Sequence, residues 1–174
     1  MTVETTIPVI LDLLTTSIRS GLPVRMVVQG TSMSPALKRG EAVIIRNFPC
    51  EELEVGDLII VERDGVLITH RIVARRADGW YTKGDGLPEL DPVVQSGKIL
   101  GRVEATERGG ISINRQLGWR RRLGALIGRL AWTEGRIYRD IVGDRQQVWL
   151  VTKLGRLIGS PFRLTILCLA VLWR

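Results

Sequence analysis

The sequence predicts a mainly β protein, in which a compact antiparallel β-domain lies between an N-terminal helix and a basic, helical C-terminal region. Short runs rich in Val and Ile follow one another closely between residues 24 and 113, which is typical of antiparallel domains with many short strands. Glycine-containing turn pairs separate several of these runs. Before and after this stretch, apolar residues recur at helical spacing instead.

An amphipathic helix is expected over residues 4–20, within an N-terminal segment of residues 1–23. Gly21 follows the helical pattern as a stop. A single short helix does not make a helix-turn-helix, so a DNA-binding front end is not expected. A secretory signal peptide is not expected either, because Glu4 comes early and Asp12 interrupts the apolar stretch. The apolar positions that define the helix are Ile7, Ile10, Leu11, Leu14 and Ile18.

Six strands are expected in the β-domain of residues 24–113. Asp64-Gly65 and Asp78-Gly79 are turn pairs typical of hairpins, and a last small hairpin is expected around Gly109-Gly110. The expected strands are Val24–Gln29, Ala42–Arg46, Asp57–Glu62, Val66–Ala74, Trp80–Lys83 and Ile99–Thr106.

Helical spacing returns in the C-terminal region of residues 114–174. Two interpretations fit its first helix: it packs on the β-domain with its basic face in water, or it lies on a bilayer surface. Tryptophans at positions 119, 132, 149 and 173 favour the bilayer, because Trp is enriched at membrane interfaces. An apolar run at residues 164–173 is too short to span a bilayer as a straight helix. The apolar stripe of the first helix is formed by Trp119, Leu123, Leu126, Ile127 and Leu130.

The positive charge of the chain is concentrated in this C-terminal region. Residues 1–113 contain 13 Lys/Arg and 15 Asp/Glu, whereas residues 114–174 contain 12 and 3, and the whole chain carries a net charge of +7. The asymmetry indicates an anionic partner, either a membrane surface or a nucleic acid. A nucleic acid is not expected, because the arginines alternate with apolar side chains and no stacking platform or nucleic-acid motif accompanies them. We therefore expect residues 114–174 to contact a membrane surface.

The two cysteines, Cys50 and Cys168, lack the spacing of metal ligands. Together with one histidine they supply too few ligands for a zinc site. Cys168 lies in an apolar run, where a cysteine packs as a small hydrophobic side chain. No disulfide, metal or organic cofactor is expected.

His70 is the only histidine of the chain, so any chemistry that needs an imidazole as a proton carrier depends on it. Ser32 precedes it on a predicted turn, and Asp85 and Asp91 follow it in an acidic loop. A serine on a turn, a histidine on a strand and an aspartate beyond them suggest a nucleophilic site. Taken singly, each residue also has a structural explanation: a histidine within a strand is more often structural, and such turns and loops are common.

Several motifs occur in a fixed order around these residues. Together they resemble the signal peptidase I family, in its archaeal and endoplasmic-reticulum branch, over about residues 28–105. The bacterial branch and the related self-cleaving repressors use a lysine base where this chain has His70. The motifs are Gly30-Thr31-Ser32-Met33-Ser34-Pro35, Lys38-Arg39-Gly40-Glu41, Val55-Gly56-Asp57-Leu58-Ile59, His70-Arg71-Ile72 and Thr82-Lys83-Gly84-Asp85.

The resemblance implies a β-domain of the signal-peptidase and repressor-cleavage type, with Ser32 as nucleophile and His70 as general base of a serine endopeptidase. Asp91 is expected to orient the imidazole, because the family has a second acidic residue at this spacing after its Lys-Gly-Asp motif. Asp85 is expected to support the site, and the reverse assignment of the two aspartates stays open. Family members commonly have a hydroxyl residue two positions before the nucleophile, where this chain has Gly30. The expected oxyanion donors are therefore the N–H of Ser32 and Thr31.

The implied substrate is an extended leader or signal-like peptide, paired along a β-edge, with small side chains before the cut. Two other functions stay open: a catalytically degenerate peptide-binding module on the same fold, and a nucleic-acid-binding protein that uses the basic C-terminal region. Because no export signal is recognised, the β-domain is expected on the cytoplasmic side of the membrane that residues 114–174 contact.

Overall fold

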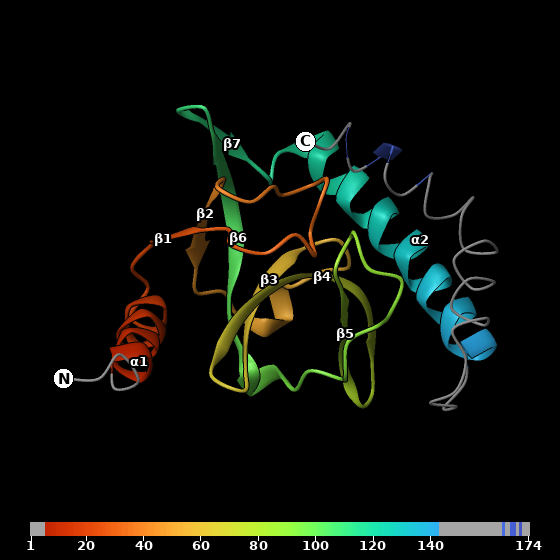
Figure 1. Cartoon of the computed structure of the whole chain (residues 1–174), viewed down its shortest axis with the longest axis horizontal. Coiled ribbons are helices and arrows are strands. Elements are labelled where there is room, and N and C mark those ends of the chain that lie inside the picture. Colours follow the sequence, from red (N-terminus) through yellow and green to blue (C-terminus); the bar gives the residue numbers. More distant parts are fainter. Residues whose placement is uncertain (1–5, 143–164, 166–167, 170, 172–174) are drawn as a thin grey trace.

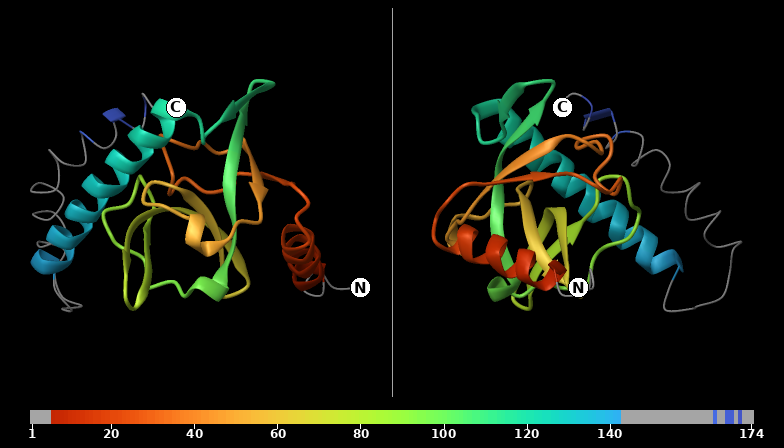
Figure 2. Two further views of the ribbon diagram at one scale, coloured as in Figure 1. Left: turned by 180° about the vertical axis from the view of Figure 1, so that it is seen from behind. Right: turned by 60° about the vertical axis from the view of Figure 1, so that its left-hand side comes forward.

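The structure, a computed structural model, describes residues 6–142 together with residues 165, 168, 169 and 171. Seven strands form one antiparallel sheet in the order β1-β2-β6-β3-β4-β5, and β7 pairs with β6. A short helix, α1 (Thr6–Arg19), precedes the sheet and a long helix, α2 (Gly118–Val142), follows it. The helices flank the β-domain on opposite sides (Figures 1 and 2). The predicted mainly β fold with an N-terminal and a C-terminal helix is confirmed.

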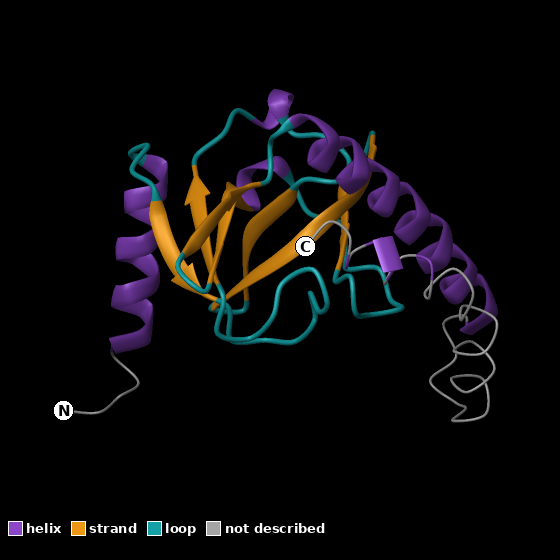
Figure 3. Cartoon of the chain, turned by 90° about the horizontal axis from the view of Figure 1, so that it is seen from above, coloured by secondary structure: helices purple, strands orange, loops and turns teal. Residues whose placement is uncertain are grey.

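Each predicted strand is found, with ends that differ from the prediction by at most two residues. Two short 3₁₀ turns, at Cys50–Glu52 and Ser96–Lys98, lie in the connections. Seen from above, the strands lie between α1 and α2 (Figure 3). The strands are β1 (Val24–Val27), β2 (Ala42–Arg46), β3 (Leu58–Arg63), β4 (Val66–Arg76), β5 (Gly79–Lys83), β6 (Ile99–Arg108) and β7 (Ile111–Asn114).

Two of the predicted turn pairs connect neighbouring strands, whereas Gly79 of the pair Asp78-Gly79 already belongs to β5 and the turn before it is formed by Ala77 and Asp78. Asp64 and Gly65 have φ values of 52° and 75° between β3 and β4. Gly109 and Gly110 have φ values of 54° and 79° between β6 and β7. Two successive residues with positive φ form the tight turn whose twist matches that of a hairpin, and glycine and aspartate tolerate this conformation. Local residue choice therefore sets the register of both hairpins.

The sheet is strongly curved. Pairing registers shift at Ile44/Ile45 in β2, at Ile60/Val61 in β3 and at Ile72/Ala74 in β4, and such bulges bend a strand and increase its twist. Residues of β1 and β4 line one common cleft, although β2, β6 and β3 lie between these strands in the sheet order. Curvature therefore brings two distant parts of the sheet to face each other.

The core has two parts, one on each side of the sheet's central strands. The larger part joins both helices to the sheet through Ile18 of α1 and Ile127 of α2, each fully buried. The smaller part surrounds Trp80 of β5 and includes Ile59 and Ile72 of β3 and β4. Helix α2 therefore packs on the β-domain, which is the first of the two interpretations that the sequence left open for this helix.

Small residues form the face of α2 that contacts the sheet. A Cβ atom at Gly128 would lie 2.9 Å from the carbonyl oxygen of Ile72, and one at Gly56 would lie 2.4 Å from the backbone of Gly124. This close approach leaves no room for large side chains. The predicted apolar stripe is confirmed at Ile127, which is buried, and at Leu123 and Leu130, which pack against the core. It is wrong at Trp119 and Leu126, which are 56% and 45% exposed.

Much of the C-terminal region of residues 114–174 lies outside the described residues. This holds for Trp149 and Trp173 and for most of the apolar run at 164–173. Of the described tail positions, Leu169 packs against the larger part of the core, whereas Cys168 is exposed. Among the helices that the structure describes, none has both the length and the apolar character needed to cross a bilayer.

We expect Gly56→Ala to lower the free energy of unfolding by about 2 kcal/mol or more, since it combines a strained φ with a collision. Gly56 has a φ of 103°, and its added Cβ would meet the α2 backbone. Gly97→Ala is the matched control, because Gly97 has open space around it. Urea unfolding followed by circular dichroism measures both variants. Equal stabilities would contradict the described contact between α2 and the sheet.

Candidate active site

Ser32 lies on the turn that follows β1. The N–H of Ser34 donates to the carbonyl of Thr31 (2.9 Å), and the N–H of Leu37 donates to the carbonyl of Met33 (2.9 Å). Met33 and Leu37 are buried in the core, and the Ser34–Pro35 peptide bond is cis. The apolar side of the turn therefore anchors it, while Ser32 remains half-buried at its edge.

His70 lies in β4, opposite Ile59 of β3. Its side chain is only 6% exposed, and its Nε2 lies 3.1 Å from Ser32 Oγ. Alternation along the strand separates it from its neighbours Thr69 and Arg71. The strand thus brings the only imidazole of the chain to a serine 38 positions earlier.

Asp91 completes the arrangement on the other side of the imidazole. His70 Nδ1 and Asp91 Oδ2 are 2.6 Å apart. Thr82 Oγ1 donates to the same carboxylate oxygen (2.7 Å), and the N–H of Asp91 donates to the carbonyl of Thr82 (2.9 Å). Arg63 Nη1 lies 3.7 Å from the other oxygen. Asp91 is therefore fixed by both its backbone and its side chain.

The environment of Asp91 favours the ionised carboxylate. Burial raises the pKa of Asp91, but the hydrogen bond and positive charge of His70, the hydroxyl of Thr82 and the charge of Arg63 together hold this pKa below its ordinary value of 3.8. A carboxylate accepts hydrogen bonds, so His70 Nδ1 carries the proton and donates it. When the ring carries only this proton, Nε2 is free to accept a hydrogen bond from Ser32 Oγ.

Asp85 has a different partner. Arg71 Nε and Nη2 donate to its two oxygens at 2.8 and 2.7 Å, and both side chains are almost fully buried. Arg71 Nη1 also donates to the carbonyl of Gly56 (2.8 Å). Asp85 therefore supports the fold of the loop, and the structure brings Asp91 rather than Asp85 to His70.

Two glycines let the loop after β5 approach the Ser32 turn closely. A Cβ atom at Gly84 would lie 2.7 Å from the carbonyl oxygen of Ser32 and 3.1 Å from His70 Nε2. The N–H of Gly86 donates to the same Ser32 carbonyl (2.8 Å), and a Cβ there would lie 2.9 Å from the carbonyl oxygen of Ser34. Glycine at both positions is required by this contact rather than by turn geometry alone.

The two sequence-predicted oxyanion donors lie together at the turn. Thr31 is exposed, directly before Ser32. Within the part of the chain that the structure describes, the N–H of Ser32 donates to no other group. A backbone N–H at the nucleophile is the type of donor that stabilises the anion formed during acyl transfer.

A cleft of about 310 Å³ opens beside Ser32. One wall is the chain from Met26 to Gly30, which leads from the end of β1 to the Ser32 turn, and the opposite wall is the start of β4 from Val66 to Thr69. The lining side chains that belong to or pack against the larger part of the core are all apolar: Met26, Val28, Met33, Leu37, Val43 and Leu67. The cleft is therefore elongated along two strands and apolar below them.

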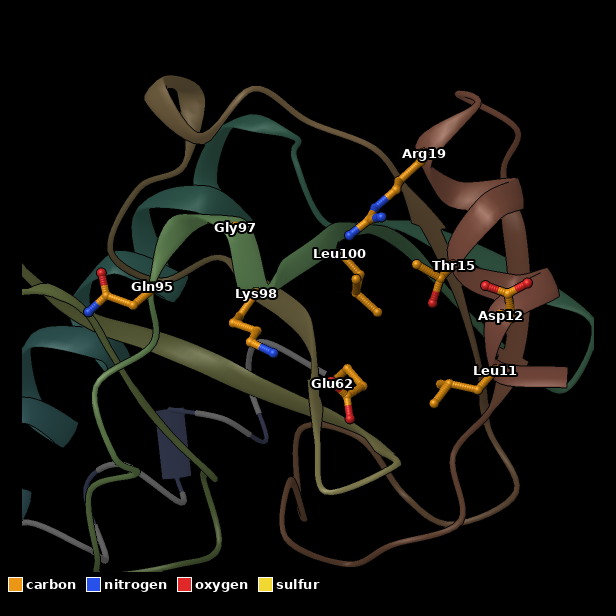
Figure 4. A pocket seen from close by; sticks show the side chains of 9 residues that line it. All are labelled: Leu11, Asp12, Thr15, Arg19, Glu62, Gln95, Gly97, Lys98 and Leu100. Carbon is orange, nitrogen blue, oxygen red and sulfur yellow. The ribbon is translucent and has the colours of Figure 1, made fainter. Parts of the chain in front are cut away.

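A larger cavity, of about 680 Å³, lies away from this site (Figure 4). Side chains of α1 form one side of it, and side chains from β3, the second 3₁₀ turn and β6 form the other. It contains none of the predicted site residues. Its lining mixes both charge signs: Leu11, Asp12, Thr15, Arg19, Glu62, Gln95, Gly97, Lys98 and Leu100.

The described residues, 6–142 with 165, 168, 169 and 171, contain no candidate metal site. No group of three or more His, Cys, Asp or Glu side chains in these parts has an arrangement that could hold a metal ion. Cys50 and Cys168 both have free thiols.

Three residues of the site were not predicted from the sequence. Thr82 was noted as part of a motif, but its hydrogen bond to Asp91 was not foreseen. Arg63 and Gly86 were not singled out at all. Strand alternation offered a hint for Thr82, because it places this side chain on the face opposite Tyr81 and Lys83. The contacts of Arg63 and Gly86 depend on loop conformation and leave no pattern in the sequence.

The sequence matches no protein-family model, and no curated protein has significant similarity to it. Any function assigned to the site must therefore be argued from its residues and their geometry.

We expect the two aspartates to differ in their effect on stability. Asp85→Asn removes the carboxylate to which two nitrogens of the buried Arg71 donate, and breaking a buried ion pair costs about 3–5 kcal/mol. Asp91→Asn removes a charge from a partly solvated site, where a hydrogen bond to a charged group contributes about 1.5–3 kcal/mol. Urea unfolding at neutral pH measures both. A larger loss for Asp91→Asn would contradict the structural role of Asp85.

We also expect a specific pH dependence for Asp91. Its folded-state pKa is depressed, so its ionisation stabilises the folded protein above its ordinary pKa, and this contribution is lost as the pH falls through the folded-state pKa. The free energy of unfolding of the wild type should thus exceed that of Asp91→Asn by more at about pH 5 than at about pH 2.5. Unfolding curves across this range test the sign. A difference that grows on acidification would rule out a depressed pKa.

Proposed function

We propose that this protein is a serine endopeptidase of the signal peptidase I type, with Ser32 as nucleophile, His70 as general base and Asp91 as the orienting acid. One observation carries the proposal: an unbroken series of polar contacts runs from Ser32 Oγ through both ring nitrogens of the only histidine to Asp91. The motif resemblance and the curved antiparallel sheet support the same assignment, including a β-domain of the signal-peptidase and repressor-cleavage type.

In the proposed acylation step, Ser32 Oγ attacks the carbonyl carbon of the scissile peptide bond while His70 Nε2 accepts the hydroxyl proton. The same nitrogen then protonates the departing amine, which leaves an ester on Ser32. Asp91 stabilises the positive imidazole that forms between these transfers. No metal or organic cofactor takes part in this sequence.

Deacylation uses the same groups. Water takes the place of the departed amine, His70 Nε2 accepts one of its protons, and the resulting hydroxide attacks the ester carbonyl. Return of the proton to Ser32 Oγ releases the carboxylate product and restores the site. The N–H of Ser32, with help from Thr31, is proposed to bind the oxyanion in both steps.

The cleft supports an extended peptide as substrate. Residues Val66–His70 of β4 pair with β3, whereas pairing with β5 begins only at Arg71, so one edge of this segment is open in the described structure. β1 likewise pairs only with β2. A peptide strand between these edges would gain main-chain hydrogen bonds. The apolar base of the cleft beside Ser32 favours small apolar side chains just before the cut.

The outer face of α2 supports an anionic membrane surface as a further partner. This face is formed by Trp119, Arg122, Leu126, Arg129, Thr133 and Arg136, which are all exposed. Glu134, the only acidic residue between positions 118 and 139, is instead buried against Lys83. A face with arginines and exposed Trp and Leu, free of carboxylates over this span, is typical of helices that lie at the headgroup level of a bilayer.

Peptide cleavage followed by mass spectrometry tests the peptidase. Leader-like peptides with small residues before the expected cut are incubated with the wild type and its variants. We expect Ser32→Ala, His70→Ala and Asp91→Asn each to lower kcat by about four orders of magnitude. Ser34→Ala, on the same turn, is the matched control and should remain active. Cleavage that persists in Ser32→Ala would refute the mechanism, and peptide binding without cleavage in the wild type would favour a binding module.

Vesicle flotation tests the membrane partner. We expect the wild type to bind vesicles that contain anionic phosphatidylserine and not neutral ones, with binding weakened by salt. Arg122→Ala combined with Arg129→Ala should weaken binding by about 30-fold, since each basic residue contributes about 1 kcal/mol near such a surface. The matched control, Arg19→Ala combined with Lys98→Ala, removes the same charge beside α1. Binding to oligonucleotides without binding to vesicles would favour a nucleic acid instead.

A further inference from the structure

We infer that α2 is a positioning element of the Ser32 site, and that Gly135 and Glu134 hold the loop of residues 84–90 so that Asp91 meets His70. The catalytic part of this inference rests on the proposed peptidase function. Its structural part concerns only the contact between Asp91 and His70 and is tested separately below.

The loop is anchored at its start by a buried ion pair with α2. Lys83 Nζ, at the end of β5, lies 2.6 Å from Glu134 Oε2, and the two side chains are 0% and 2% exposed. Lys83 also pairs in the sheet with Arg71, the residue after His70. Glu134 therefore fixes the point at which the loop leaves the sheet.

The loop is anchored again at its end, on the next residues of the same helix. A Cβ atom at Gly135 would lie 2.6 and 2.7 Å from Leu90 Cγ and Cδ2, so the α2 backbone and the Leu90 side chain are in direct contact. Tyr138 Oη donates to Glu89 Oε1 (3.2 Å) one turn further along. Leu90 immediately precedes Asp91, so its position limits where the Asp91 carboxylate lies.

The opposite side of the loop contacts the nucleophile. Gly86 N–H donates to the Ser32 carbonyl (2.8 Å), while α2 holds Lys83 and Leu90 on the other side. The loop is thus enclosed between the Ser32 turn and α2. Any movement of α2 toward or away from the sheet shifts Asp91 relative to an imidazole that β4 holds in place.

Gly135→Val tests this inference without leaving a buried charge unpaired. The added side chain collides with Leu90 and should displace Asp91, and a misplacement of about 1 Å can lower the rate on the order of 100-fold. We expect kcat to fall and KM to change little, because the cleft lies on the other side of Ser32. Adding Leu90→Ala removes the collision and should restore most of the rate. Gly97→Val, at a glycine with open space around it and away from α2, is the matched control.

The single histidine allows a readout that does not depend on activity. In protein labelled with ¹⁵N-histidine, the imidazole signals all belong to His70, and the Nδ1 proton reports its hydrogen bond to Asp91. We expect Gly135→Val to shift this signal toward its position in Asp91→Asn, and Gly135→Val/Leu90→Ala to return it. Gly135→Ala applies the same displacement with less bulk and serves if the valine variant does not fold.

An unchanged His70 signal in both glycine variants would overturn the inference, as would a shift that Leu90→Ala does not reverse. These outcomes are separate from those of the proposed function. A wild type that cleaves no peptide would refute the peptidase, but a reversible shift of the His70 signal in Gly135→Val would still establish the coupling between α2 and Asp91.

Discussion

The hydrogen bond between His70 Nδ1 and Asp91 Oδ2 is the contact on which the rest of the site depends. It fixes the orientation and the tautomer of the imidazole, and thereby turns Nε2 toward Ser32 Oγ. Burial raises the pKa of Asp91, whereas the hydrogen bond from Thr82 and the charge of Arg63 lower it and so stabilise the carboxylate. Without a carboxylate here the ring loses the partner that fixes its orientation, and in the proposed mechanism Ser32 loses its base.

Asp91 and Asp85 stabilise this contact in different ways. Asp91 faces His70, whereas Asp85 neutralises the buried Arg71. A second buried pair, Lys83 with Glu134, ties the same segment to α2. Buried ion pairs add little net stability compared with apolar packing, but they disfavour alternative arrangements because each partner is costly to leave alone. The loop is therefore held in one conformation by charges on either side of it.

The β-domain was predictable because its determinants are local: β-branched runs form the strands, and pairs such as Asp64-Gly65 form the turns. The site was harder to predict, because Ser32, His70 and Asp91 are far apart in sequence. Only the motifs around these residues indicated that they lie close together. The packed face of α2 was mispredicted in part, because hydropathy also points to Trp119 and Leu126, which are exposed. The closest contacts between α2 and the sheet are instead made at Gly124 and Gly128, where the two backbones approach each other. The spacing of apolar residues in the sequence does not reveal such a backbone contact.

The most direct test of the account is to trap the acyl-enzyme. The protein is mixed with a peptidyl ester whose acyl portion carries small side chains, quenched in acid within the first turnover, and digested for mass spectrometry. We expect the acyl group on the fragment that contains Ser32, and no acyl group in His70→Ala or in Asp91→Asn. An acyl group on another residue, or equal acylation of Ser32 without His70, would contradict the proposed mechanism.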